Sequence, residues 1–368
     1  MKIVQLVPEL HEGGVERGTV ELSREFVLRG HESVVISRGG PLVRQIEEHG
    51  GLHVTMDLCS KNIITAPFRA IKLRQILNKL QPDIIHARSR VPAWLSYFAN
   101  KKLKLPFVTT VHGIYSVNSY SKIMTQGDAV ICISEVLKDN VLSNYGTDQK
   151  KITVIQRGAD LEYFNPDRLD HNFISKFRTD FDLHDKFILT SVGRVTYLKD
   201  YESFIEAVSL VKKQIPNIKG VIVGGVTADK ENYLSSLKRL TKELNVEGNI
   251  IFAGSQAKMP EIYALSDLMV NGSLTMGNVG RTVVESLAMN TPVLATSYEG
   301  LVNLVKDGEN GFIIDTKNPH DLAEKIYMAK QSTFKDIRSR INPEYTLQTM
   351  VDKTLGVYRK LLNEKESL

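Results

Sequence analysis

A glycine turn followed by a carboxylate one helical turn later is the most informative feature of this sequence. Residues 280–285 read GRTVVE, a pattern that predicts a helix opening at Gly280. The first turn of a helix has unpaired amide donors and a partial positive charge, so a phosphate can bind there without a side-chain ligand. A carboxylate at Glu285 suits the paired hydroxyls of a sugar. A site that binds a phosphate next to a sugar diol would suit a nucleotide. The alternative interpretation is an ordinary crossover helix on which Glu285 is solvated.

Two cations at the end of an apolar run support the nucleotide interpretation. Residues 187–192 predict a strand, Arg194 follows it closely, and Lys199 comes five residues later. A diphosphate carries charge in the ground state and gains more as a leaving group, so it needs fixed cations of this kind. An isolated pair of this type is usually a surface feature, but the position at a strand end favours contact with a ligand.

Short apolar runs alternate with helical patterns along the chain, which predicts parallel sheets covered by helices. The expected strands of the first half are 2–7, 33–37, 83–86, 107–111, 129–133 and 151–155. Those of the second half are 187–192, 220–223, 250–253, 268–271 and 293–296. We therefore expect an α/β fold of two doubly wound Rossmann-like domains, with the ligand site at the carboxyl ends of the strands in the cleft between the sheets.

The length of 368 residues also favours two domains. The expected boundaries are 1–165 for the first domain and 186–342 for the second, joined by a connecting segment at about 160–186. Residues 343–368 are expected to form a C-terminal helix that packs back on the first domain.

The composition disfavours several classes of protein. Cys59 and Cys132 are too few for a disulfide framework or a cysteine-based zinc site. No His, Cys, Asp or Glu cluster has the spacing of metal ligands, and Asp180 and Asp182 are interpreted as part of a solvated turn. The longest apolar run, 129–133, is too short to span a membrane, and no signal-peptide pattern precedes the first strand. We expect a cytoplasmic protein that needs no metal.

The positive charge is concentrated in residues 61–127, where Asp83 is the single acid. The basic residues of this stretch are Lys61, Arg69, Lys72, Arg74, Lys79, Arg88, Arg90, Lys101, Lys102, Lys104 and Lys122. Apolar and aromatic residues are interleaved with them, which fits contact with an anionic membrane or a lipid-linked acceptor. A solvated helix face is an equally good interpretation. Nucleic acid is disfavoured because no recognition motif accompanies the charge.

The order and spacing of short motifs make the chain resemble the retaining GT-B glycosyltransferases of family 4 over nearly its whole length. The motifs are GGVER at 13–17, GHE at 30–32, DIIHA at 83–87, TVHG at 110–113, ISE at 133–135, YFNP at 163–166, GR at 193–194 with Lys199, TPV at 291–293 and DGENG at 307–311. Each match is short, and their combination carries the resemblance.

The resemblance implies a role for individual residues. The donor diphosphate would be held by Gly193, Arg194 and Lys199, assisted by the helix start at Asn278, Val279, Gly280, Arg281 and Thr282. Glu285 would bind the ribose of the nucleotide. Gly14 would let backbone approach the leaving phosphate or the acceptor, with a plain tight turn as the alternative. His112 would lie near the donor sugar, with a satisfied core histidine as the alternative. His112, Arg194 and Lys199 are the expected catalytic residues.

The expected function is retaining transfer of a hexose from a nucleotide diphosphate sugar, UDP-sugar favoured, without a cofactor or metal. The expected acceptor is a hydroxyl of a cell-envelope glycan, a lipopolysaccharide or a lipid-linked molecule, reached at the inner face of a membrane. Two positions depart from the family pattern, since Gly277 and Asn303 replace glutamates. Gly277 motivates the alternative of a catalytically impaired nucleotide-binding scaffold. A nicotinamide-dependent dehydrogenase is disfavoured because residues 8–14 lack GxGxxG.

Overall fold

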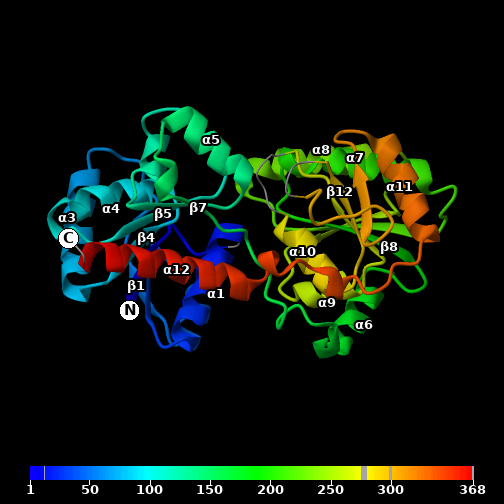
Figure 1. The fold of residues 1–368 in the computed structure, drawn as a ribbon. Coiled ribbons are helices and arrows are strands. Elements are labelled where there is room, and N and C mark those ends of the chain that lie inside the picture. Colours follow the sequence, from blue (N-terminus) through cyan, green and yellow to red (C-terminus); the bar gives the residue numbers. More distant parts are fainter. Residues whose placement is uncertain (12, 275–279, 298–300, 367–368) are drawn as a thin grey trace. The chain divides into compact units, whose positions relative to one another are not determined.

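The apolar runs form two parallel β-sheets in the computed structural model, which describes residues 1–11, 13–274, 280–297 and 301–366 (Figure 1). The chain divides into two compact units. One comprises Met1–Arg157 and Leu347–Leu368, and the other comprises Gly158–Thr346. The second unit therefore begins before residue 165, where the sequence pattern placed the end of the first domain.

The first unit contains a parallel sheet of seven described strands in the order β3-β2-β1-β4-β5-β6-β7. The strands are β1 (Lys2–Leu6), β2 (Glu32–Ser37), β3 (Leu52–Thr55), β4 (Ile84–Ala87), β5 (Phe107–Val111), β6 (Ala129–Cys132) and β7 (Ile152–Val154). The α-helices are α1 (Gly14–Leu28), α2 (Val43–Glu48), α3 (Ala66–Leu80), α4 (Arg90–Leu103), α5 (Glu135–Tyr145) and α12 (Leu347–Glu366). The inner strands are almost wholly buried because helices cover both faces of the sheet.

The last helix, α12, belongs to the core of this first unit. Leu347, Val351 and Tyr358 of α12 cluster with Leu22 and Phe26 of α1, and Figure 1 shows the two helices beside each other. Burial of apolar side chains of this size removes them from water at a gain of roughly 1.5–3 kcal/mol each. Packing of this kind holds the chain terminus on the sheet that carries α1 and its preceding glycines.

The second unit contains six described strands in the order β10-β9-β8-β11-β12-β13. They are β8 (Phe187–Val192), β9 (Ile218–Val223), β10 (Ile250–Gly254), β11 (Leu268–Asn271), β12 (Val293–Thr296) and β13 (Gly311–Ile314). The α-helices are α6 (His171–Asp180), α7 (Tyr201–Val211), α8 (Glu231–Glu243), α9 (Met259–Ala264), α10 (Arg281–Ala288) and α11 (Pro319–Gln331). In Figure 1, α7, α8 and α11 cover one face of this sheet, and α6, α9 and α10 cover the other.

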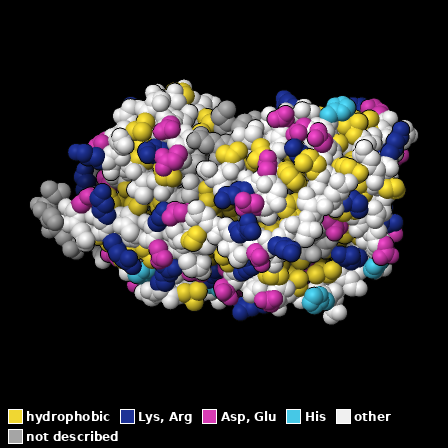
Figure 2. All heavy atoms as spheres, turned by 45° about the vertical axis from the view of Figure 1, so that its right-hand side comes forward, with side chains coloured by type: hydrophobic (Ala, Val, Ile, Leu, Met, Phe, Trp, Pro, Cys, Tyr) yellow, Lys and Arg dark blue, Asp and Glu magenta, His cyan; other side chains and the backbone are white. Residues whose placement is uncertain are grey.

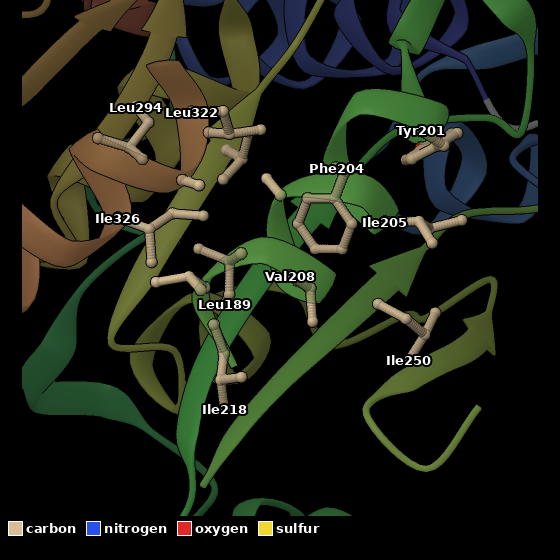
Figure 3. Packing of buried hydrophobic residues seen from close by; sticks show 14 of the residues in the cluster. Leu189, Tyr201, Phe204, Ile205, Val208, Ile218, Ile250, Leu294, Leu322 and Ile326 are labelled. Atoms are coloured by element: carbon tan, nitrogen blue, oxygen red, sulfur yellow. The ribbon is translucent and has the colours of Figure 1, made fainter. Parts of the chain in front are cut away.

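The larger apolar core of the second unit lies between its sheet and helices α7 and α11 (Figure 3). Phe204 and Val208 of α7, Ile326 of α11, and Leu189 and Leu294 of the strands all belong to this core, and all five are at most 1% exposed. This packing fixes the carboxyl ends of β8 and β11, from which the loops of the candidate site begin.

Two edge strands and the segment between the predicted domains differ from the sequence prediction. The short edge strands β3 and β13 were not predicted, because β3 is only partly buried and β13 begins with a glycine inside the DGENG turn pattern. The predicted connecting segment at 160–186 contains helix α6, so it is part of the second unit. Phe173 and Phe177, one helical turn apart, pack with Ile262 of α9, which explains why this helix forms.

Candidate functional site

The loop after β8 brings Arg194 and Lys199 to the carboxyl edge of the second sheet. Gly193 follows the strand, and its carbonyl accepts a 2.6 Å hydrogen bond from the hydroxyl of the buried Tyr201. A Cβ at Gly193 would lie 2.7 Å from Cε of Lys199, so only glycine lets this lysine fold back against the strand end. Lys199 closes a short 3₁₀ turn, Tyr197–Lys199, that precedes α7.

The two cations of this loop are electrostatically coupled. Burial lowers the pKa of Lys199, and the positive charge of Arg194 lowers it further. Within the described part of the chain, no carboxylate forms a salt bridge with either side chain. Two like charges held together without a counter-ion make a site that an anion would stabilise.

The start of α10 supplies backbone donors to the same edge of the second sheet. Gly280 has φ +40°, and a Cβ there would lie 2.1 Å from Cδ2 of Leu301, so the position requires glycine. Among the described residues, no side chain caps the first turn of α10. The hydroxyl of Thr282 instead accepts a 3.1 Å hydrogen bond from Asn271 at the end of β11. The helix start is therefore tied to a strand end.

Glu285 is held by two partners rather than solvated. Its Oε1 accepts a 2.6 Å hydrogen bond from Nε of Arg281, and its Oε2 accepts a 2.9 Å hydrogen bond from the hydroxyl of Tyr263. Glu285 is 7% exposed and Tyr263 is fully buried. This geometry contradicts the alternative of a solvated Glu285 on an ordinary crossover helix. It gives the carboxylate one fixed orientation, with lone pairs left for further donors.

In the first unit, His112 directly follows β5 at the carboxyl edge of the sheet. Both ring nitrogens are buried and have no hydrogen-bond partner among the described residues. Burial, with the charges of Arg88 and Arg157, holds the pKa of His112 well below its usual value, so the ring is neutral at pH 7. His86, by contrast, has partners on both nitrogens, Tyr358 and Thr110, each at 2.6 Å. The interpretation as a satisfied core histidine therefore applies to His86 and not to His112.

Gly14 begins α1 next to Arg157, whose Nη2 donates to the Gly14 carbonyl. A Cβ on Gly14 would lie 2.7 Å from Nη1 of this arginine, and one on Gly18 would lie 3.3 Å from Nη2. The two glycines thus make room for a guanidinium along α1, a role that the sequence did not predict. Arg88 lies beside the same helix, 5% exposed, and burial lowers its pKa to about 10. This edge of the first sheet is consequently cationic.

Comparison with known proteins identifies the family. The model of Glycosyltransferase Family 4 matches residues 12–163, and the model of Glycosyl transferases group 1 matches residues 174–342. A glycosyltransferase of Rickettsia africae with a known crystal structure is 31% identical, with a TM-score of 0.88 and 98% of both chains covered. The chain belongs to glycosyltransferase family 4. It has the GT-B fold, in which each of the two parallel sheets forms the centre of one Rossmann-like unit.

Two further relatives of this family 4 glycosyltransferase are informative. The alpha-monoglucosyldiacylglycerol synthase of Streptococcus pneumoniae is 28% identical over 72% of this chain and 66% of its own length. The Anabaena protein HepE, solved in complex with UDP and glucose, is 20% identical over 100% of both chains with a TM-score of 0.79.

The site of this glycosyltransferase contains residues that sequence reasoning missed. Tyr263, Asn271 and Arg157 support predicted site residues from distant elements, and no motif marked them. Asn278, Val279 and Gly277 lie outside the described residues.

The described residues show neither a metal centre nor a membrane span. No three His, Cys, Asp or Glu side chains among them are grouped as metal ligands would be. Both aspartates are exposed: Asp180, which ends helix α6 and so does not lie in the predicted turn, pairs with Lys176 at 2.7 Å, and Asp182 pairs with Lys219 at 3.3 Å. In the same part of the chain, every helix is too short or too polar to cross a bilayer. Basic and acidic side chains are interspersed on the face that Figure 2 shows.

Proposed function

We propose that this chain transfers a hexose from a nucleotide diphosphate sugar, UDP-sugar favoured, to an acceptor hydroxyl with retention at the anomeric carbon. The observation that carries the proposal is the anion site of the second unit, where the coupled cations Arg194 and Lys199 and the start of α10 lie at one sheet edge. A fixed carboxylate follows one turn into that helix. The complex of HepE with UDP supports the choice of nucleotide by analogy of fold.

In this proposal each group of the second unit has a separate task. Arg194 and Lys199 neutralise the diphosphate, whose charge rises as the bond to the sugar breaks. The amides at the start of α10 bind a phosphate oxygen, as helix N-termini do. Glu285, oriented by Arg281 and Tyr263, accepts hydrogen bonds from the ribose hydroxyls. The binding free energy thus comes from charges that are in place before the donor arrives.

Transfer with retention needs no protein nucleophile in this proposal. The bond between the anomeric carbon and the phosphate oxygen breaks, and the acceptor oxygen forms its bond to that carbon on the same face. The acceptor proton passes to the departing phosphate, so the products are a glycoside and the free nucleotide diphosphate. His112 is neutral, and neither ring nitrogen has a partner in the described part of the chain, so it is suited to a hydrogen bond with a donor sugar hydroxyl. No divalent metal is required because fixed cations neutralise the leaving group.

The acceptor in this proposal is a cell-envelope glycan, a lipopolysaccharide or a lipid-linked molecule. The cationic edge around Arg88 and Arg157 in the first unit and the basic stretch 61–127 support an anionic acceptor, with peripheral binding at the cytoplasmic face of a membrane. The diacylglycerol-based product named for the pneumococcal relative is consistent with this class.

The proposed function is tested by a thermal-shift panel of nucleotide sugars, followed by turnover of the best binder and determination of the product anomer by NMR. We expect a UDP-sugar to give the largest shift and the product to keep the donor configuration. An inverted product would refute the proposal. Tight binding without any turnover would instead favour the scaffold alternative, which depends on Gly277 outside the described residues.

A further inference from the structure

An apolar pocket lies between α3 and α4 in the first unit. Its volume is about 530 Å³, within the range of roughly 300–1,000 Å³ typical of small-molecule sites. Small side chains keep it open where the two helices would otherwise pack, namely Ala66, Ala70 and Ala99. Trp94 and Phe98, stacked with ring centroids 5.5 Å apart, form part of the wall. Most of the lining therefore comes from the two helices α3 and α4.

The pocket opens at the carboxyl edge of the first sheet, the edge that also carries His112. Residues 60–63 follow β3, Val91 follows β4, and Tyr120 follows β5, and all of them contribute to the lining. Ile63 and Phe68, close to this opening in sequence, are 84% and 72% exposed. Large apolar side chains in contact with water beside an apolar cavity indicate a surface that binds an apolar partner.

The charged residues of the lining are all basic. Lys61, Arg69 and Arg74 contribute to it, and no acidic side chain does among the described lining residues. Nη2 of Arg69 donates to the carbonyl of Asn62 at 3.0 Å, but its Nε and Nη1 are buried atoms with no hydrogen-bond partner among the described residues. Unused donors on this half-buried arginine are unfavourable, and an anion at this point would pair with them. Asp83, the single acid of the stretch, accepts a hydrogen bond from the Lys2 amide instead.

We propose that this pocket binds the acyl chain of a single anionic lipid, with the lipid phosphate bound by Arg69 at the pocket edge. Methylene groups gain free energy when they leave water and fill an apolar pocket. The unused donors of Arg69, beside Lys61 and Arg74, match a phosphate and would repel a cationic partner. A purely apolar ligand would leave these donors unpaired.

The position of the pocket gives this lipid a role in catalysis. A chain buried between α3 and α4 presents its head group at the sheet edge that carries His112. The assignment of the lipid as the sugar acceptor rests on the proposed function, whereas its binding does not. The two are tested separately below.

The chain contains one tryptophan, and this residue, Trp94, lines the pocket. Its fluorescence therefore reports occupancy of this site alone. Lysophosphatidylglycerol with a brominated acyl chain, titrated below its critical micelle concentration, should quench Trp94 fluorescence saturably because bromine quenches tryptophan on contact. A monoacylglycerol with the same brominated acyl chain, which has an uncharged head group and no phosphate, should bind at least about tenfold more weakly.

Arg69→Gln should weaken binding of the anionic lipid by about tenfold or more and leave binding of the neutral lipid unchanged. Lys79→Gln removes an equal charge from the same helix at an exposed position outside the pocket lining, and it should bind like the wild type. Quenching with the expected selectivity would support lipid binding in this pocket even if no sugar transfer to the lipid is detected.

Three results would overturn the proposal. Absence of saturable quenching by the anionic lipid would show that the pocket does not take an acyl chain. Equal affinity for both head groups, unaffected by Arg69→Gln, would remove the phosphate contact. A fluorescence change on dilution of the protein alone, with no response to either lipid, would assign this face to self-association.

Discussion

Replacement of Tyr263 by phenylalanine tests whether the orientation of Glu285 matters for nucleotide binding. The Tyr263 hydroxyl helps to fix this carboxylate, and its distance to Oε2 is 2.9 Å. Arg281 holds the other oxygen at 2.6 Å. Tyr263→Phe leaves the ring in place, so the change removes one hydrogen bond without opening a cavity.

The expected size of the effect follows from the burial of this pair. A hydrogen bond to a charged group contributes about 1.5–3 kcal/mol. Lost stability of this size lowers the melting temperature of a unit of this length by about 3–12 °C, at roughly 2–4 °C per kcal/mol. If the released carboxylate also loses its hydrogen bonds to the ribose hydroxyls, the preference for UDP over 2′-deoxy-UDP should fall by about tenfold or more.

The assay is calorimetric titration of UDP and 2′-deoxy-UDP into four proteins. The wild type should prefer UDP by about 10- to 150-fold, the value of a carboxylate hydrogen bond. Glu285→Gln and Tyr263→Phe should each reduce this preference. Tyr358→Phe is the matched control, since it removes another buried phenol contact, 2.6 Å from His86 in the first unit, and should leave the preference unchanged.

Two outcomes would refute this reasoning. Full preference for UDP in Tyr263→Phe, together with a lowered melting temperature, would make the tyrosine a purely structural residue. Equal affinity of the wild type for both nucleotides would remove Glu285 from the ribose site.

Arg194→Ala should weaken UDP binding about tenfold or more, and unchanged affinity would exclude the residue from the diphosphate site. Turnover should survive excess EDTA, whereas a loss restored by manganese or magnesium would contradict metal independence. Burial holds the pKa of His86 well below 6.5 in the folded protein. At pH values below about 6.5 the unfolded state therefore binds more protons than the folded state. Stability should therefore fall between pH 7 and 5.5, with a smaller fall in His86→Gln; urea unfolding measures both. Gly277→Glu should sharpen discrimination between donor sugars while leaving UDP affinity nearly unchanged; reduced turnover would contradict this expectation.

The sequence was sufficient to predict the buried strands of both sheets. It also predicted the turn at Gly280, where the backbone conformation requires glycine. The predicted runs 187–192, 268–271 and 293–296 coincide with β8, β11 and β12. The helix start at Gly280 was predicted because a left-handed residue before an amphipathic helix leaves a recognisable pattern. These signals are local, so a single sequence contains them in full.

The sequence could not predict contacts that depend on how distant elements pack. Tyr263 lies far from Glu285 along the chain, and only the packing of α9 against α10 brings its hydroxyl to the carboxylate. Arg157 lies beside Gly14 for the same reason. The apolar pocket was beyond prediction too, since its alanines on α3 and α4 look like ordinary helix formers until the two helices are placed together.

The central claim is that the second unit binds a nucleoside diphosphate through the charge of Lys199 beside Arg194. Calorimetric comparison of UDP with uridine, in the wild type and in Lys199→Met, tests it most directly. The wild type should bind UDP at least about a hundredfold more tightly than uridine, and Lys199→Met should lose about tenfold or more of that preference while its affinity for uridine stays unchanged. A variant that keeps the full preference for UDP would contradict the claim.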